Sequence, residues 1–170
     1  GGDGYADEVS VTLVNDETLS LSLGDDINQE VMEAFLIDAP QQAQKLFVAL
    51  HAIKTSSDPE SPLHEAQRAS HTLKGAANLL DIRAIANFSH EMEALLEKLA
   101  DRFTEQQLPP SADELDALLE AADCVSMMVD YLLGQEAIPE QRKEILQNLL
   151  NIQQGSAPTA IQAVQSEITQ

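Results

Sequence analysis

The chain has 170 residues and a formal net charge of −20 at pH 7. This length suits one domain with a sizeable core, and so acidic a surface excludes nucleic acid as a partner because the phosphates would be repelled. Helix-forming residues dominate the composition. No segment is long and apolar enough for a transmembrane helix and no secretory signal pattern is present, so membrane insertion is not expected.

A single cysteine, Cys124, occurs in the chain. One cysteine cannot build a disulfide framework, which favours the reducing cytoplasm as the compartment. Cys124 lies in an apolar stretch, so it is predicted to be a small core residue and not a reactive thiol.

Residues 1–25 are expected to form an N-terminal extension or linker. Within them, 9–13 and 19–23 alternate at the strand period, which leaves two interpretations open, a hairpin and an extended linker.

A first helix, capped by Asp25 or Asp26, is predicted to run through Ile37. Residues 38–40 contain Pro40, which predicts a break and a new helical segment to about Thr55. A turn is expected at 56–61.

The next helix carries the most informative pattern. With about 100° of turn per residue, His71 falls roughly 150° from the centre of the apolar stripe and is expected to face water. Lys74 lies at the border of the stripe, and Gly75 lies one turn beyond His71 on the exposed face. The stripe consists of Leu63, Ala66, Ala69, Ser70, Leu73, Ala77 and Leu80.

A following helix is predicted to begin at Asp81 as its N-cap. His90 lies nearly opposite its apolar stripe, and Glu93 lies at the edge. If the two helices form an antiparallel hairpin about residue 81, then His71, His90 and Glu93 fall at about the same height. The stripe consists of Ile82, Ile85, Phe88, Ser89, Met92, Leu95, Leu96, Leu99 and Phe103.

Two further helices are predicted, one over 112–133 that ends at Gly134 and one from Pro139 to about Gln153. Residues 155–170 read as a linker. The pattern predicts an all-α protein, with an antiparallel four-helix bundle and one or two additional C-terminal helices within residues 26–154.

The pentad His71-Thr72-Leu73-Lys74-Gly75, with a histidine and a glutamate 19 and 22 residues after His71, resembles the histidine phosphotransfer (HPt) domain of CheA-type chemotaxis kinases. The resemblance runs from about Asn28 to Phe103 and continues more weakly to a fifth helix. Asp81 stands where the family usually has a glycine near the turn, and Pro40 interrupts what is often one continuous first helix.

The resemblance implies that His71 is the phosphoacceptor. It also implies that Lys74, His90 and Glu93 belong to the same catalytic site. The implied partners are the ATP-binding catalytic domain of a histidine kinase and the receiver domain of a response regulator, whose aspartate takes the phosphoryl group. The chain has no glycine-rich phosphate loop, so it is expected to be a phosphoryl carrier, part of a larger kinase, without ATP-dependent activity of its own. No cofactor and no metal is expected.

The site chemistry follows from elementary properties of the side chains. A neutral imidazole is a nucleophile at cell pH. Glu93 is expected to hold one ring nitrogen as a donor, and Lys74 to offset phosphate charge. His90 is expected to hydrogen-bond either Glu93 or the imidazole. Gly75 has two interpretations, a docking surface for a partner and close helix packing.

Two alternatives come from other classes of protein. A metal enzyme in a helical bundle would need Glu-x-x-His or His-Glu-x-x-His patterns; no histidine has a glutamate three residues before it, and Ala94 replaces the second zinc-binding histidine after His90. The second alternative is a helical scaffold of the same fold with a silent histidine, which the sequence leaves open. His51 and His64 are expected to be ordinary surface residues.

Overall fold

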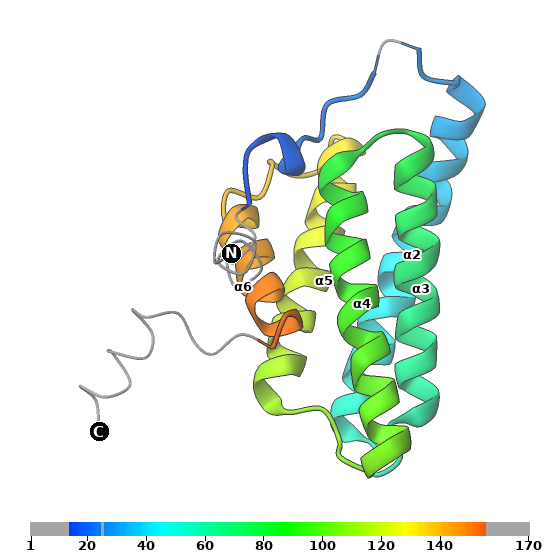
Figure 1. Cartoon of the computed structure of the whole chain (residues 1–170). Helices are drawn as coiled ribbons and strands as arrows, with labels where there is room; N and C mark the ends of the chain where they lie inside the picture. The colour runs from blue at the N-terminus through cyan, green and yellow to red at the C-terminus, as the bar shows by residue number, and fades with distance from the viewer. Residues whose placement is uncertain (1–13, 25, 156–170) are drawn as a thin grey trace, which may run out of the picture.

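A computed structural model describes residues 14–24 and 26–155 of the chain (Figure 1). Over these residues it contains a short 3-10 turn, five α-helices and no strand, which confirms the all-α class. The elements are η1 (Glu17–Leu19), α2 (Gln29–Thr55), α3 (Glu60–Leu79), α4 (Arg83–Gln106), α5 (Ala112–Leu132) and α6 (Arg142–Gln153).

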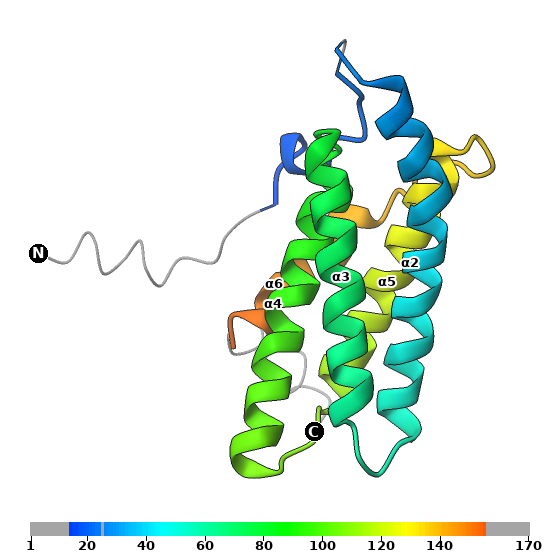
Figure 2. The ribbon, with the colours of Figure 1, turned by 90° about the vertical axis from the view of Figure 1, so that its right-hand side faces the viewer.

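The four long helices form an antiparallel bundle in which α2 packs on α3, α3 on α4, α4 on α5, and α5 back on α2 (Figures 1 and 2). The shorter α6 lies outside this bundle against α4 and α5. The predicted bundle with an additional C-terminal helix is therefore confirmed. None of the helices that the structure describes is long and apolar enough to cross a membrane.

The expected break at Pro40 is wrong, because α2 continues through this residue for 27 residues. A proline inside a helix removes one backbone hydrogen bond and costs about 3 kcal/mol. Here the residues on either side of it, Phe35, Ala39 and Ala43, are all buried on one face. Burial of one continuous apolar stripe in the bundle outweighs the local penalty. The N-cap of α2 is Asn28, whose side chain accepts from two backbone amides, and not Asp25 or Asp26.

The turn between α3 and α4 also differs from the prediction, because Asp81 is not an N-cap. It adopts a left-handed backbone with φ 55° just after the end of α3. The amide of Ile82 donates to the carbonyl of Ala77, and that of Asp81 to the carbonyl of Asn78, which is the Schellman arrangement of a helix end. Glycine favours this conformation, which explains why an aspartate is unusual there; α4 begins two residues later, at Arg83.

Residues 14–24 pack against the bundle and do not form a hairpin. Leu19 and Leu21 are buried, but 19–23 contain no strand, and 9–13 lie outside the described residues. The carbonyl of Ser20 accepts from the amide of Ala84 in α4, and that of Leu19 accepts from Arg142 in α6. The segment therefore joins the first turns of these two helices.

Helix α5 follows its sequence signals closely, whereas α6 begins later than predicted. Ser111 and Glu114 form a capping box at the start of α5, and Gly134 has a left-handed φ of 78° beyond its end. The last helix begins at Arg142 and not at Pro139.

Candidate functional site

The site centres on a contact between His71 of α3 and Glu93 of α4. The Nδ1 atom of His71 lies 2.6 Å from Oε2 of Glu93, while 67% of the His71 side chain stays exposed. Small residues of α3, among them Ala66, Ser70 and Ala77, are fully buried. They let the two helices approach closely, which brings a carboxylate of one helix within reach of a ring on the other.

Lys74 occupies the other oxygen of the same carboxylate. Its Nζ atom lies 2.5 Å from Oε1 of Glu93, and the two side chains are 24% and 16% exposed. Burial raises the pKa of Glu93, but hydrogen bonds and charge from Lys74 and His71 together bring this pKa below its ordinary value. Glu93 is therefore ionised at neutral pH and fixed in orientation at both oxygens.

The ionisation of Glu93 decides the tautomer of His71. An ionised carboxylate is an acceptor only, so Nδ1 of the neutral ring carries the proton and donates it to Glu93. The lone pair then resides on Nε2. Because most of the side chain is exposed, an orienting carboxylate behind the ring leaves a nucleophilic nitrogen accessible to an incoming group.

His90 does not join this cluster. The expected hydrogen bond to Glu93 or to the His71 ring is not formed in the part of the chain that the structure describes. Its imidazole lies instead near Glu91, with 3.9 Å between Nε2 and Oε1. Burial raises the pKa of Glu91, an effect that the nearby His90 partly offsets. A shared height on two helices did not fix the direction in which the imidazole points.

Gly75 lies on the exposed face one turn beyond His71, as predicted. A Cβ atom added at this position would meet nothing within 4 Å. Close helix packing therefore gives no reason for a glycine here, and the docking interpretation stays a prediction.

The remaining candidates are ordinary structural residues. His51 and His64 are exposed, and the ring of His51 lies edge-on to Phe47 with 4.6 Å between centroids. Cys124 is buried, and burial raises the pKa of its thiol to about 12, so the core assignment is confirmed. Among the described residues, no group of three or more His, Cys, Asp or Glu side chains could hold a metal ion.

The comparison with protein families matches the sequence model of the Hpt domain to residues 30–133. The chain belongs to the Hpt domain family. This match covers the whole of α3, α4 and α5 and most of α2, so it includes every residue of the His71 site.

Similar proteins of known name include chemotaxis kinases. The chain is 25% identical over 122 residues to the chemotaxis protein CheA of Treponema pallidum, covering 72% of this chain and 14% of that protein. It is 27% identical over 101 residues to the sensor histidine kinase CheAY of Helicobacter pylori, covering 59% of this chain and 12% of that protein. The Hpt chain thus spans about one-seventh of the length of these relatives or less.

A solved structure shares the fold of this Hpt chain. It is the phosphorylated P1 domain of CheA3 from R. sphaeroides, in a complex with CheY6, with a TM-score of 0.61 and 18% identity. The likeness covers 75% of this chain and 98% of that one.

Sequence reasoning brought together His71 and Glu93 but missed the ion pair between Lys74 and Glu93. A signal for it was present, because Lys74 and Glu93 each lie at the border of the apolar stripe of their helix. Border positions of two adjacent antiparallel helices face each other across the seam, so oppositely charged residues there are placed to pair.

Proposed function

We propose that this chain accepts a phosphoryl group on Nε2 of His71 from the catalytic domain of a histidine kinase and passes it to an aspartate of a response-regulator receiver domain. The observation that carries the proposal is the contact between Glu93 and Nδ1 of the exposed His71. It leaves Nε2 as a nucleophile with a defined orientation.

In the first step, the lone pair of Nε2 attacks the γ-phosphorus of ATP. The new bond joins Nε2 to phosphorus, the bond from phosphorus to the bridging oxygen breaks, and ADP leaves with that electron pair. The ring acquires positive charge while Nδ1 keeps its proton, and the Glu93 carboxylate stabilises this charge. Lys74 holds Glu93 in place, and we propose that it also offsets the charge of the phosphoryl group.

In the second step, a carboxylate oxygen of the receiver attacks the phosphorus and the bond to Nε2 breaks. The electron pair returns to Nε2, which restores the neutral ring. Phosphoryl transfer depends mainly on positioning and electrostatics, so the partner can supply the metal and the acceptor. An exposed histidine with no enclosing pocket suits a reaction completed by two successive partners.

The two partners are supported by different observations. The named relatives are a chemotaxis protein and a sensor histidine kinase, of which this chain matches only a small part, which supports a catalytic domain elsewhere in a larger kinase. The solved neighbour is a phosphorylated domain in complex with CheY6, which supports a receiver as the second partner. The lone buried Cys124 supports the cytoplasm as the compartment.

The test is incubation of the chain with ATP and a chemotaxis-type kinase catalytic domain, followed by mapping of acid-labile phosphate. We expect label on His71 alone among the four histidines, none in His71→Gln, and none with ATP in the absence of the catalytic domain. Transfer of the label to a receiver domain completes the test. A chain that binds both partners but takes no phosphate would instead be the silent scaffold.

A further inference from the structure

The face of α3 that carries His71 continues toward the Asp81 turn. His71, Gly75 and Asn78 follow one another at intervals of four and three residues, so they share one side of the helix, and all three are exposed. Asn78 is seven residues from His71, which is about 10 Å along the axis. Its side chain makes no hydrogen bond to any described residue.

A second row on α4 runs toward the same turn. Arg83, Asn87 and His90 follow at intervals of four and three residues. Arg83 and His90 are exposed and Asn87 is half-buried. This row includes the histidine that does not join the His71 cluster, which leaves its imidazole available to a partner.

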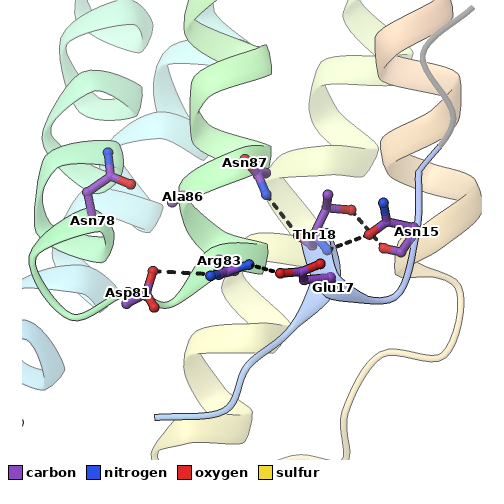
Figure 3. Close-up of a pocket in the computed structure, with 8 residues that line it drawn as sticks. All are labelled: Asn15, Glu17, Thr18, Asn78, Asp81, Arg83, Ala86 and Asn87. Atoms are coloured by element: carbon purple, nitrogen blue, oxygen red, sulfur yellow. Dashed lines mark hydrogen bonds and ion pairs between the residues drawn. The ribbon is translucent and has the colours of Figure 1, made fainter. Parts of the chain in front are cut away.

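The two rows end at a polar pocket of about 330 Å³ between the α3–α4 turn and the N-terminal segment (Figure 3). Ala86 of α4 also lines it. The polar side chains of the pocket come from three parts of the chain: Asn78 and Asp81, then Arg83 and Asn87, then Asn15, Glu17 and Thr18.

The N-terminal wall of the pocket is fixed to α4. Nη1 of Arg83 lies 2.5 Å from Oε1 of Glu17, and Nδ2 of Asn87 donates to the carbonyl of Thr18 at 2.9 Å. This wall precedes residue 30, where the match to the Hpt family begins. This wall is therefore outside the family match, whereas the lining residues on α3, the α3–α4 turn and α4 lie inside it.

The charged groups of the pocket are two carboxylates and one guanidinium. The Arg83 guanidinium is engaged by Glu17 at 2.5 Å and by Asp81 at 3.6 Å, while the two carboxylates remain 75% and 76% exposed. The oxygen of the Asn87 amide accepts no hydrogen bond from a described residue. With two carboxylates against one guanidinium, the pocket carries an excess of negative charge, which favours a cationic donor.

We propose that this pocket receives a lysine or arginine side chain of the receiver domain when the acceptor aspartate of that domain lies at His71. The proposal rests on the proposed function and adds a specificity-determining contact to it. A standard interface buries about 800 Å² on each partner and is roughly 28 Å across. The pocket, about 10 Å from His71 along α3, falls within such a footprint.

A receiver depends on such a contact more than the kinase domain does. The chain matches only 14% and 12% of its named relatives, so the kinase domain is proposed to belong to the same polypeptide. A tethered domain meets His71 at an effective concentration of about millimolar whatever its contacts. A receiver that diffuses separately obtains its affinity and its selectivity from the interface alone.

The first experiment compares two variants with matched controls. Glu17→Lys reverses a charge of the pocket, and Asn78→Lys places a cation in it. Glu105→Lys and Gln106→Lys make the same charge changes at exposed positions at the other end of α4. The phosphorylated chains are mixed with a panel of receiver domains from the source organism, and kcat and KM of transfer are measured.

We expect both pocket variants to raise KM about fivefold, the scale of one partly exposed ion pair, with kcat and the rate of phosphorylation by the kinase domain unchanged. The two controls leave KM at the native value. If the pocket variants and the controls have the same KM, or if the pocket variants slow phosphorylation and transfer equally, the proposal is overturned.

A second measurement separates this proposal from the proposed function. The unphosphorylated, ¹⁵N-labelled chain is titrated with the same receivers, and the side-chain amide signals of Asn78 and Asn87 are followed. Shifts of these signals, lost in Glu17→Lys and kept in Glu105→Lys, support the pocket even if His71 takes no phosphate. Absence of shifts with a receiver that nevertheless accepts phosphate from His71 rejects the pocket and leaves the proposed function intact.

Discussion

Oε2 of Glu93 lies 2.6 Å from Nδ1 of His71, although 22 residues separate them in the chain. The same carboxylate binds Lys74 through its other oxygen. The mostly buried carboxylate of Glu93 thus fixes both the tautomer of the His71 ring and the position of the Lys74 ammonium group. A change at Glu93 is therefore expected to alter the reaction of His71 more than the stability of the bundle.

Glu93→Gln keeps the size of the side chain and removes the charge that holds Nδ1 as a donor. We expect phosphorylation to slow tenfold or more, about 1.4 kcal/mol of activation free energy, with little change in Tm. Initial rates with a kinase catalytic domain and a thermal melt measure the two effects. Glu97→Gln, one turn on and exposed, is the control. A native phosphorylation rate in Glu93→Gln would show that the carboxylate does not orient the ring.

Lys74→Met removes the cation but keeps the apolar stem. Burial raises the pKa of Glu93, and Lys74 is the largest of the opposing influences, so loss of the lysine should shift this pKa upward. A ¹³C NMR titration of the Glu93 carboxyl measures the shift, with exposed Lys54→Met as the control. We also expect phosphorylation at pH 7 to slow about tenfold. An unchanged Glu93 titration would contradict the ion pair.

Glu114 ties the start of α5 to α4, away from His71. Burial raises its pKa, but hydrogen bonds from Arg102 and Ser111 lower it more, so the net pKa is below the ordinary 4.5. A lowered folded-state pKa stabilises the protein above the unfolded value, and this stabilisation is lost as pH falls through the folded value. Glu114→Gln should lower the free energy of unfolding at pH 7 by about 1–2 kcal/mol.

The difference between native protein and Glu114→Gln should shrink as the pH falls below about 4.5. Urea unfolding at several pH values measures it, and exposed Glu120→Gln is the control. Phosphorylation of His71 should stay at the native rate. A stability difference that is the same at acid and neutral pH would show that the ionised form of Glu114 contributes nothing.

The alignment of α3 with α4 could be predicted because each has one apolar stripe and a short turn joins them. These two facts set the relative height of His71 and Glu93, and the edge position of Glu93 set its direction. His90 shows where this reasoning stops. Its height was predicted by the same arithmetic, but its position away from the seam left its partner undetermined.

Two other departures arise where tertiary packing overrides a local signal. Pro40 reads as a helix break because the local penalty is large, yet burial on both sides keeps α2 continuous. Leu19 and Leu21 alternate like a strand, and both are buried against the bundle. The period of two reports that one face is covered. It reports neither the local backbone, since Leu19 ends the 3-10 turn η1, nor whether the covering neighbour is a strand or a helix.

Asp81 occupies a left-handed position with φ 55°, so its substitution tests the turn that joins the two site helices. Asp81→Ala should lower the free energy of unfolding by about 1 kcal/mol, because alanine lacks the short polar side chain with which aspartate and asparagine tolerate the left-handed conformation. Asp81→Gly should raise the free energy of unfolding by about 0.5 kcal/mol. Asparagine also adopts the left-handed conformation, so Asp81→Asn removes only the negative charge near Arg83. This variant therefore separates the effect of backbone strain on stability from the effect of the ion pair with Arg83. Urea unfolding measures all three, and equal stability of Ala and Gly would contradict the strain.

Gly75 is the last test, because its position separates docking from folding. A Cβ there meets nothing within 4 Å, and glycine is a poorer helix former than alanine by about 1 kcal/mol. Gly75→Ala should therefore stabilise the chain by about that amount and leave phosphotransfer nearly native.

Gly75→Lys should also fold, but its long side chain lies one turn from His71 on the face that a partner approaches. We expect transfer to a receiver to fall at least about tenfold in this variant, measured beside a thermal melt. Native transfer in Gly75→Lys would show that partners approach His71 from another side, and unfolding of Gly75→Ala would restore the packing interpretation of the glycine.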